Sequence, residues 1–475
     1  MTRKANGLVP HQQAMEEIVI IASLFKWTVL ATIVGALIGI CVYVFLKGLD
    51  WGIAARPGAW WSVLLLPPAG YVTGWLIQRF APDAEGHGTE AVIRAIHQRW
   101  GKIRAQVIPV KALATIISLA AGGSAGKEGP SAQIGSGVAS VVADLIGLGN
   151  MDRRKLVVCG ISAGFASVFG LPIAGTLFGI EVLAIGAVSY DYLLPSFVAG
   201  VTSFVVARRL GMTYPDYATD VPGLSEIVVV KTLIFGLLVG LVALLLIKTL
   251  EAAHRLFGKL PVNRPVRAAL GGVVLALMYP LVGYSYMGLS LDLLNSALTG
   301  GAVVATAFLW KIVATSVTLG SGWSGGIITP IFVVGATAGS VIAPALGFSP
   351  GFGAALGMVG LVAAATNTPI AAILMGVEMF GPGIGAQVAA VAIASFLVVG
   401  HRSVYPSQIL ALRKAEVVRV HLNRPLEENR EIEVHPRAYG FLWRRWVRRL
   451  GQLFRHETSK TSGHKGAAGE MRGDM

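Results

Sequence analysis

The stretch Gly122–Pro130, with the sequence GGSAGKEGP, places a lysine and a glutamate between glycines in a long apolar region. A carboxylate at membrane depth costs roughly 2.5–3.5 kcal/mol on insertion scales, and such residues usually face a cavity or a polar pathway. Pro130 suits the first turn of a new helix, and the glycines let the backbone approach a ligand closely. A helix that begins here directs free N–H groups and the positive end of its dipole at that cavity. The stretch therefore predicts an anion-binding site that includes Glu128.

The composition indicates the environment of this site. The chain has 475 residues, of which 54% are hydrophobic and 13% are charged, and this balance is typical of a polytopic membrane protein. The 59 glycines fit closely packed membrane helices. Cys41 and Cys159 both lie in apolar segments, so we expect two buried thiols rather than a disulfide. We expect no metal ion and no cofactor.

Positive charge is unevenly distributed along the chain. The formal net charge is +14, and much of it lies on loops beside apolar segments and in residues 413–475. Lysine and arginine near membrane segments tend to stay on the cytoplasmic side. The charge therefore predicts a multi-pass protein of the cell (inner or plasma) membrane with both termini in the cytoplasm. Because the charge lies beside spans, we do not expect a nucleic-acid partner.

The apolar segments are of two kinds. Residues 1–17 form a polar cytoplasmic segment without a secretory signal, and we expect Met1–Gln13 to lack regular structure. Ile18–Leu46 and Trp60–Ile77 can each span a membrane, whereas most apolar segments after residue 104 are short and interrupted by glycine or proline. Broken helices at membrane depth are tolerated where they are buried in protein or line a cavity. The pattern predicts an all-α polytopic membrane protein with tilted and broken helices.

An internal repeat relates the two halves of the chain. LPIAGTLFGIEV at Leu171–Val182 matches TPIAAILMGVEM at Thr368–Met379, with both the proline and the glutamate offset by 197 residues. Upstream, GSGWSGGIITP at Gly320–Pro330 stands where GGSAGKEGP stands in the first half. The repeats extend over about 61–210 and 227–400. Two halves that are each broken at the same place predict a binding site at their interface.

Four motifs are similar to those of one family of membrane proteins. They are GKEGP at Gly126–Pro130, GGIITP at Gly325–Pro330, GHGTE at Gly86–Glu90 and VYPSQIL at Val404–Leu410. Over residues 18–412, and with the motifs in the expected order, the chain resembles the CLC family of chloride channels and proton/chloride exchangers. The resemblance implies an inverted-repeat transmembrane domain over these residues. It also implies a homodimer in which each subunit has its own anion pathway.

The resemblance also implies candidate site residues. Glu128 corresponds to the gating glutamate, whose carboxylate competes with an anion for the same N–H groups until it is protonated. The alternative is a structural ion pair with Lys127. Tyr405 corresponds to the tyrosine that closes the inner side of the anion pathway, and the alternative is an interfacial anchor. The complete anion-binding set is His87, Lys127, Glu128, Gly129, Ile327, Ile328 and Tyr405, with backbone amides as the donors at 127–129 and 327–328.

The sequence departs from the family's pattern at four positions. His87 replaces a serine, and its imidazole either alters selectivity or belongs to a turn that points away from the pathway. Glu90 replaces a proline and Thr329 a small residue. Val182 stands where many exchangers have an inner proton-relay glutamate. Because valine cannot carry protons, we expect a passive or gated chloride pathway; the alternative is a proton-coupled antiporter of chloride, fluoride or nitrate, with His87 or Glu90 in place of the glutamate.

Two further sets of residues have alternative interpretations. Glu181 and Glu378 occupy one position of the repeat, and we expect them to accept hydrogen bonds from the backbone at broken helix ends. GGSAG and GISAG, which contain Ser124 and Ser162, fit the G-x-S-x-G pattern of serine hydrolases. That pattern arises easily in a chain rich in glycine, alanine and serine, so we do not expect an enzyme; an intramembrane serine hydrolase is the remote alternative.

The tail after residue 412 is basic and too short for paired regulatory CBS domains. Its stretch Phe441–Phe454, FLWRRWVRRLGQLF, places apolar side chains on one helical face and arginines on the other. This pattern predicts an amphipathic helix that binds either membrane lipids or the protein's own cytoplasmic face.

Overall fold

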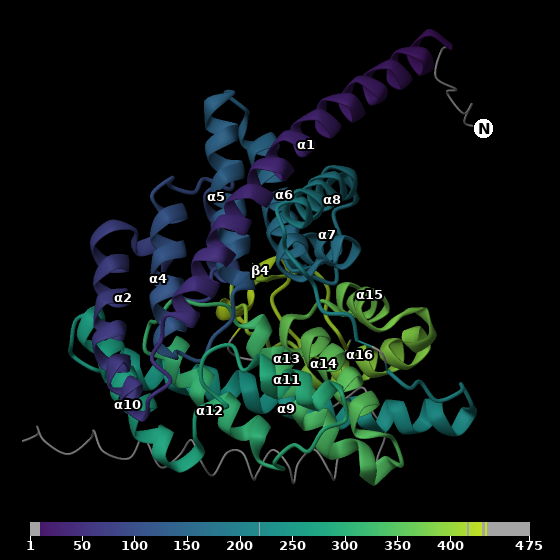
Figure 1. The fold of residues 1–475 in the computed structure, drawn as a ribbon. Helices are drawn as coiled ribbons and strands as arrows, with labels where there is room; N and C mark the ends of the chain where they lie inside the picture. The colour runs from purple at the N-terminus through teal and green to yellow at the C-terminus, as the bar shows by residue number, and fades with distance from the viewer. Residues whose placement is uncertain (1–9, 218, 416–417, 430–432, 435–475) are drawn as a thin grey trace, which may run out of the picture.

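The computed structural model describes residues 10–217, 219–415, 418–429 and 433–434, and the predicted all-α class is confirmed for them. Helix α1 (Pro10–Ala54) crosses the body of the protein and extends beyond it at its N-terminal end (Figure 1). It packs against α4, α5, α6 and α8. Six helices of the described residues are long and apolar enough to cross a membrane. Because α1 begins at Pro10, the expectation that Met1–Gln13 lacks regular structure is wrong for its last four residues.

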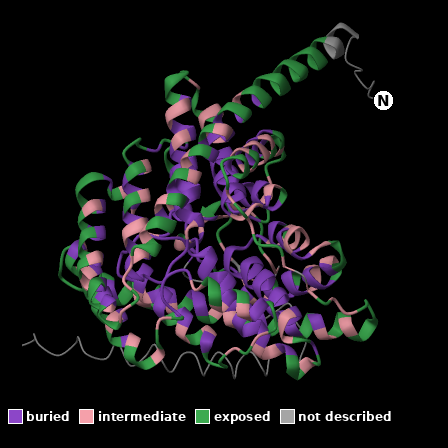
Figure 2. Ribbon diagram, in the orientation of Figure 1, coloured by how far each residue is buried: buried purple, intermediate pink, exposed green. Residues whose placement is uncertain are grey.

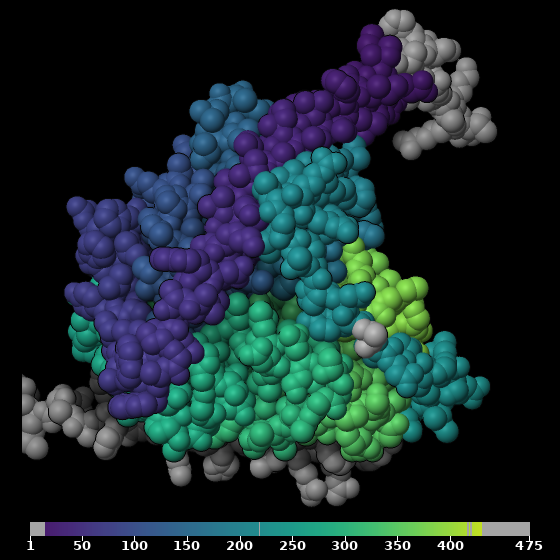
Figure 3. All heavy atoms as spheres, in the orientation of Figure 1, coloured from purple at the N-terminus to yellow at the C-terminus, as the bar shows by residue number. Residues whose placement is uncertain are grey.

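After α1 the helices form two series in the same order, which Figure 3 shows as adjoining blue and green regions. The long helix α9 (Glu226–Gly258) connects them. The first series is α2 (Leu66–Phe80), α3 (Thr89–Gln98), α4 (Val107–Ala121), α5 (Glu128–Leu145), α6 (Asn150–Phe169), α7 (Pro172–Glu181) and α8 (Leu193–Arg209). The second series is α10 (Arg264–Val282), α11 (Leu291–Leu298), α12 (Ala307–Gly320), α13 (Ile328–Ile342), α14 (Pro350–Thr366), α15 (Pro369–Phe380) and α16 (Gly385–Val399).

The remaining elements are short. A three-stranded sheet pairs β1 with β2 in parallel and β2 with β4 in antiparallel, and β3 pairs with β5. The sheet joins the segment after α7 to the segment after α16. The strands are β1 (Ala184–Ile185), β2 (Ile409–Leu410), β3 (Val418–Arg419), β4 (Arg424–Pro425) and β5 (Glu433–Val434). The 3-10 helices are η1 (Trp60–Leu65), η2 (Pro82–Ala84), η3 (Tyr190–Tyr192), η4 (Ala343–Leu346), η5 (Pro382–Ile384) and η6 (Leu426–Glu428).

The helix breaks have the same local cause in both series. Helix α6 is followed by Gly170 and α14 by Asn367, each in the left-handed conformation that glycine and asparagine adopt most readily. Two residues later, Pro172 begins α7 and Pro369 begins α15, where proline fits the first helical position. Each break therefore starts a new short helix, and α7 and α15 pack against each other.

Small residues let the central helices pack with their backbones in close contact. A Cβ atom added at Gly339 of α13 would lie 2.1 Å from the carbonyl oxygen of Gly353 in α14. One added at Gly164 of α6 would lie 2.6 Å from that of Ser131 in α5. Such contacts hold helices together where lipid supplies no hydrophobic driving force. Figure 2 shows the result, with buried residues concentrated at the centre and exposed residues on the outer helices.

Candidate functional site

The two glycine-rich turns predicted from the repeat lie side by side. Gly126 donates its N–H to the carbonyl of Gly326 at 2.8 Å, and Gly326 donates back to Gly126 at 2.6 Å. Helix α5 begins at Glu128 and α13 begins at Ile328, directly after these turns. The N-terminal ends of two helices from opposite halves therefore meet in the buried centre of the protein.

The carboxylate of Glu128 occupies the N-terminus of α13. Its Oε1 accepts the N–H of Ile328 at 2.5 Å, and its Oε2 accepts the hydroxyl of Thr329 at 2.7 Å. The side chain is 1% exposed. A carboxylate bound by a backbone amide and a hydroxyl stands where a small anion would receive the same hydrogen bonds.

Two glycines leave the space that this carboxylate fills. A Cβ atom at Gly126 would lie 2.4 Å from both oxygens of Glu128, and one at Gly326 would lie 2.2 Å from Oε1. Neither glycine has a positive φ, so a close approach of atoms rather than backbone conformation requires glycine here.

The other predicted donors lie on the same two turns but differ in their surroundings. Ile327 is buried at the residue before α13, and Lys127 occupies the corresponding position before α5. Among the described residues, no salt bridge joins Lys127 to Glu128, so the alternative of a structural ion pair receives no support from the geometry. Gly129 lies against the carbonyl of His87, where an added Cβ atom would lie 1.9 Å from the oxygen.

His87 and Tyr405 meet beside this turn. The two rings are 5.7 Å apart between centroids, His87 is buried and Tyr405 is fully buried. Neither His87 Nδ1 nor the Tyr405 hydroxyl has a hydrogen-bond partner within the described part of the chain. The ring of His87 therefore does not point away from the site, and two polar atoms are left available for a ligand or water.

Tyr405 is held in place by the segment that follows it. Ser407 donates its hydroxyl and, at 3.4 Å, its N–H to the carboxylate of Glu90. Arg94 also donates to this carboxylate, at 3.1 Å. Gln408 donates to the carbonyl of Val182 at 2.9 Å. Glu90 is thus engaged in positioning the Tyr405 segment, which leaves His87 as the better placed of the two proposed proton carriers.

Sequence reasoning missed two buried lysines, Lys111 and Lys311, at equivalent positions of the repeat. The ammonium of Lys111 donates to the carbonyls of Ala84 at 3.0 Å and Gly86 at 2.5 Å. That of Lys311 donates to Gly288 at 2.9 Å, with further bonds to Tyr286 and Ser290. Each lysine belongs to the third helix of its series and holds the loop before the second one, and neither is in a salt bridge with a described carboxylate. Their offset of 200 residues, equal to that of Pro130 and Pro330, was the available signal.

Glu181 and Glu378 bind the backbone reciprocally. Glu181, at the end of α7, accepts the N–H groups of Ile370 and Ala371 at 3.1 and 2.8 Å, at the start of α15. Glu378 of α15 accepts those of Ile173 and Ala174 at 3.1 and 2.7 Å, at the start of α7. Each carboxylate supplies acceptors for the free N–H groups of a helix N-terminus. The expected backbone contacts are therefore present.

Replacement of either glutamate by glutamine should destabilise the fold rather than change transport. Because an amide has one acceptor oxygen where the carboxylate has two, E181Q leaves a buried N–H unpaired at a cost of about 1–3 kcal/mol. Thermal unfolding in detergent should show a lower midpoint for E181Q and E378Q, with anion efflux per folded protein unchanged. Selective loss of proton movement at full stability would place Glu181 in a proton pathway instead.

The two candidate serine nucleophiles are engaged elsewhere. Ser162 donates to the carbonyl of Thr176 at 3.2 Å, and Ser124 is paired with the hydroxyl of Thr315 at 3.0 Å. Among the described residues, neither has a hydrogen bond to a histidine or carboxylate that would activate it. The geometry gives no support to the hydrolase alternative.

Comparison with known proteins identifies the family. The model for voltage gated chloride channels matches residues 69–400, and the chain belongs to this family, the CLC family. It is therefore a multi-pass membrane protein that transports anions rather than an enzyme.

Individual relatives give finer comparisons. The chain is 34% identical to a chloride/fluoride channel protein of Pseudomonas syringae pv. tomato, over 83% of this chain and 88% of that protein. It is 30% identical to an H⁺/Cl⁻ exchange transporter, ClcA, of Vibrio cholerae serotype O1, over 65% and 69%. The solved structure of a CLC-type fluoride/proton antiporter superposes with a TM-score of 0.78 at 30% identity, covering 81% of this chain and 98% of that one.

Proposed function

We propose that this protein is a proton-coupled antiporter of a small halide, with Glu128 as its gate. The observation that carries the proposal is the position of the Glu128 carboxylate on the N–H of Ile328 and the hydroxyl of Thr329. A deprotonated carboxylate competes with the anion for these donors, whereas a protonated one is neutral and leaves them free. Anion binding at this site then requires protonation of one group, and this dependence couples the movements of the two ions.

The expectation of a passive pathway rested on Val182, and the relatives favour the alternative. Val182 is fully buried, and its carbonyl accepts a hydrogen bond from Gln408. Its side chain carries no proton, but the relatives named as exchangers and as a fluoride/proton antiporter support coupling in this chain by another route.

The donors at the site support fluoride as the preferred anion, with chloride as the competitor. Fluoride is the smallest halide and accepts the strongest hydrogen bonds, so close amide and hydroxyl donors favour it. The space that Gly126 and Gly326 leave holds two carboxylate oxygens without room for a further methyl group. The names of two relatives, a chloride/fluoride channel and a fluoride/proton antiporter, agree with this choice.

Several wider expectations are part of the same proposal. We propose a transport domain over residues 18–412 and a homodimer with one anion pathway in each subunit. We also propose that both termini face the cytoplasm, and that lipids surround the outer helices. The amphipathic stretch Phe441–Phe454 lies outside the described residues.

Purified protein in liposomes tests the proposed function. With no initial pH difference across the membrane, an outward fluoride gradient should drive proton uptake. An outward chloride gradient should drive this uptake more weakly. Protein-free vesicles give the background. Rapid anion efflux with proton movement at this background would contradict coupled antiport and restore the passive pathway. Coupling with chloride alone would contradict the choice of anion.

A further inference from the structure

His254 lies between a solvent-accessible pocket and the buried His87. It belongs to the last turns of α9, and its ring lies 6.4 Å from that of His87 between centroids. His87 in turn packs on Tyr405 and carries its carbonyl against Gly129, the residue after the proposed gate. Residues from α9, from the loop before α3 and from the segment after α16 therefore form a continuous row beside Glu128.

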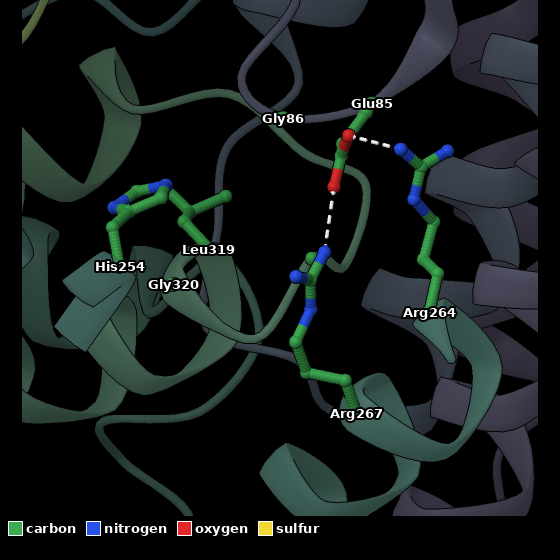
Figure 4. Close-up of a pocket in the computed structure, with 8 residues that line it drawn as sticks. Glu85, Gly86, His254, Arg264, Arg267, Leu319 and Gly320 are labelled. Atoms are coloured by element: carbon green, nitrogen blue, oxygen red, sulfur yellow. Dashed lines mark hydrogen bonds and ion pairs between the residues drawn. The ribbon is translucent and has the colours of Figure 1, made fainter. Parts of the chain in front are cut away.

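The pocket gives water access to the first member of this row. It has a volume of about 370 Å³ and is lined by residues of four segments, among them His254 and Gly86. Figure 4 shows His254 on one side and Glu85 on another, where Arg264 and Arg267 (3.0 Å) pair with its carboxylate. Such a space holds several water molecules, which polar side chains on its walls can bind. His254 is exposed, whereas His87 is buried and does not line the pocket.

Hydrogen bonding fixes the form of the His254 ring. Its Nδ1 lies 2.9 Å from the carbonyl oxygen of Leu250. Since a carbonyl oxygen accepts and cannot donate, Nδ1 carries the hydrogen in this contact. Nε2 of the neutral ring is then an acceptor that can take up and release a proton while the Nδ1 contact persists.

Basic side chains from three helices surround the His87 ring. It interacts electrostatically with His254 from α9, Lys111 from α4 and Arg94 from α3. Across the pocket His254 faces Glu85, Arg264 and Arg267. Because Lys111 and Arg94 are cations, a protonated His87 is unfavourable beside them. A proton should therefore pass on from His87 rather than remain bound to it.

We infer that His254 is the entry residue of a proton relay that runs from the pocket through His254 and His87 to Glu128. This inference rests on the proposed antiport. A proton leaves water in the pocket and binds Nε2 of His254, which becomes an imidazolium. It then passes to His87, directly or through one bridging water, and His254 returns to its neutral form. From His87 the proton moves past the Tyr405 hydroxyl to the Glu128 carboxylate, whose protonation frees the donors of α13. The relay replaces the acid that is absent at Val182.

H254N tests the relay, because asparagine keeps an N–H for Leu250 but cannot carry a proton near neutral pH. Anion efflux and proton uptake are measured in the same vesicles. Protons taken up per anion should fall roughly tenfold or more in H254N, with efflux retained. Protons taken up per anion should also fall in H87Q, whatever its efflux, and the double variant should lose no more of this ratio than either single one. H97N is the matched control, since His97 lies in α3 and bonds to the carbonyl of Leu183 at 3.0 Å rather than to a member of the row.

The outcomes separate the relay from the function on which it rests. Wild-type coupling with unchanged coupling in H254N overturns the relay alone. Efflux without proton uptake in the wild type overturns the antiport itself and the relay with it. Equal loss of efflux and uptake in H254N that elutes as monodisperse protein also contradicts the relay. If H254N is not monodisperse, H254Q is judged by the same two rates.

Discussion

In vesicles, E128Q should release fluoride at a rate that no longer depends on pH and should take up no protons above the protein-free background. Glutamine has nearly the shape of the protonated glutamate and no charge, so it does not compete with an anion for the N–H of Ile328. The wild type should behave differently, because acidification protonates Glu128 and frees the site. Its efflux should therefore rise as the pH falls, whereas that of E128Q should be high throughout.

E128D supplies the control for this variant. Aspartate keeps the charge but is shorter by one methylene, so it reaches the donors of α13 less well. Its efflux should remain dependent on pH while its coupling weakens. If E128Q retained proton uptake, Glu128 would not be the group that carries the proton, and the proposed gate would be wrong.

The second large effect is expected from G126A. The three atoms nearest to a Cβ at this position all belong to the carboxyl group of Glu128, at 2.4–2.8 Å. Because the end of a glutamate side chain can swing away, the added methyl group should displace the carboxylate rather than unfold the protein. Since an anion would take the place of these oxygens, the methyl group also meets the anion, and efflux at low pH should fall about tenfold, equivalent to about 1.4 kcal/mol of weakened anion binding.

Two comparisons check this explanation of G126A. In an E128A background the same substitution should still lower efflux by a similar factor, since the methyl group meets the anion whether or not Glu128 is present. G149A should leave transport unchanged, because nothing lies within 4 Å of a Cβ at that position and its φ is −63°. A rise in efflux that requires Glu128 would contradict this, because it would show that the methyl group displaces the carboxylate and leaves the anion site open.

The repeat made much of this site predictable. Gly and Pro fix where helices start, and the common offset places Glu128 and Ile328 at the same point of two related turns. Their meeting in the centre follows from that symmetry. The reciprocal contacts of Glu181 and Glu378 could also be expected, because free N–H groups at buried helix ends require acceptors.

Other features depend on contacts that no local pattern encodes. Thr329 was noted as a departure from a family pattern, but its bond to Glu128 depends on the side-chain position of a residue 201 positions away. His254 lies at the end of an apolar helix, far in sequence from His87. The start of α1 at Pro10 was missed because a helix can continue in polar sequence beyond the apolar span.

Proton exchange on anion binding tests most directly whether a carboxylate and an anion compete for one site. Fluoride is titrated into unbuffered detergent-solubilised protein at neutral pH, and the protons bound or released are measured with a pH electrode. The account predicts that fluoride binding to the wild type takes up protons, and that E128Q binds fluoride more tightly with no proton uptake. Fluoride binding that takes up the same number of protons in both proteins, or none in either, would contradict it.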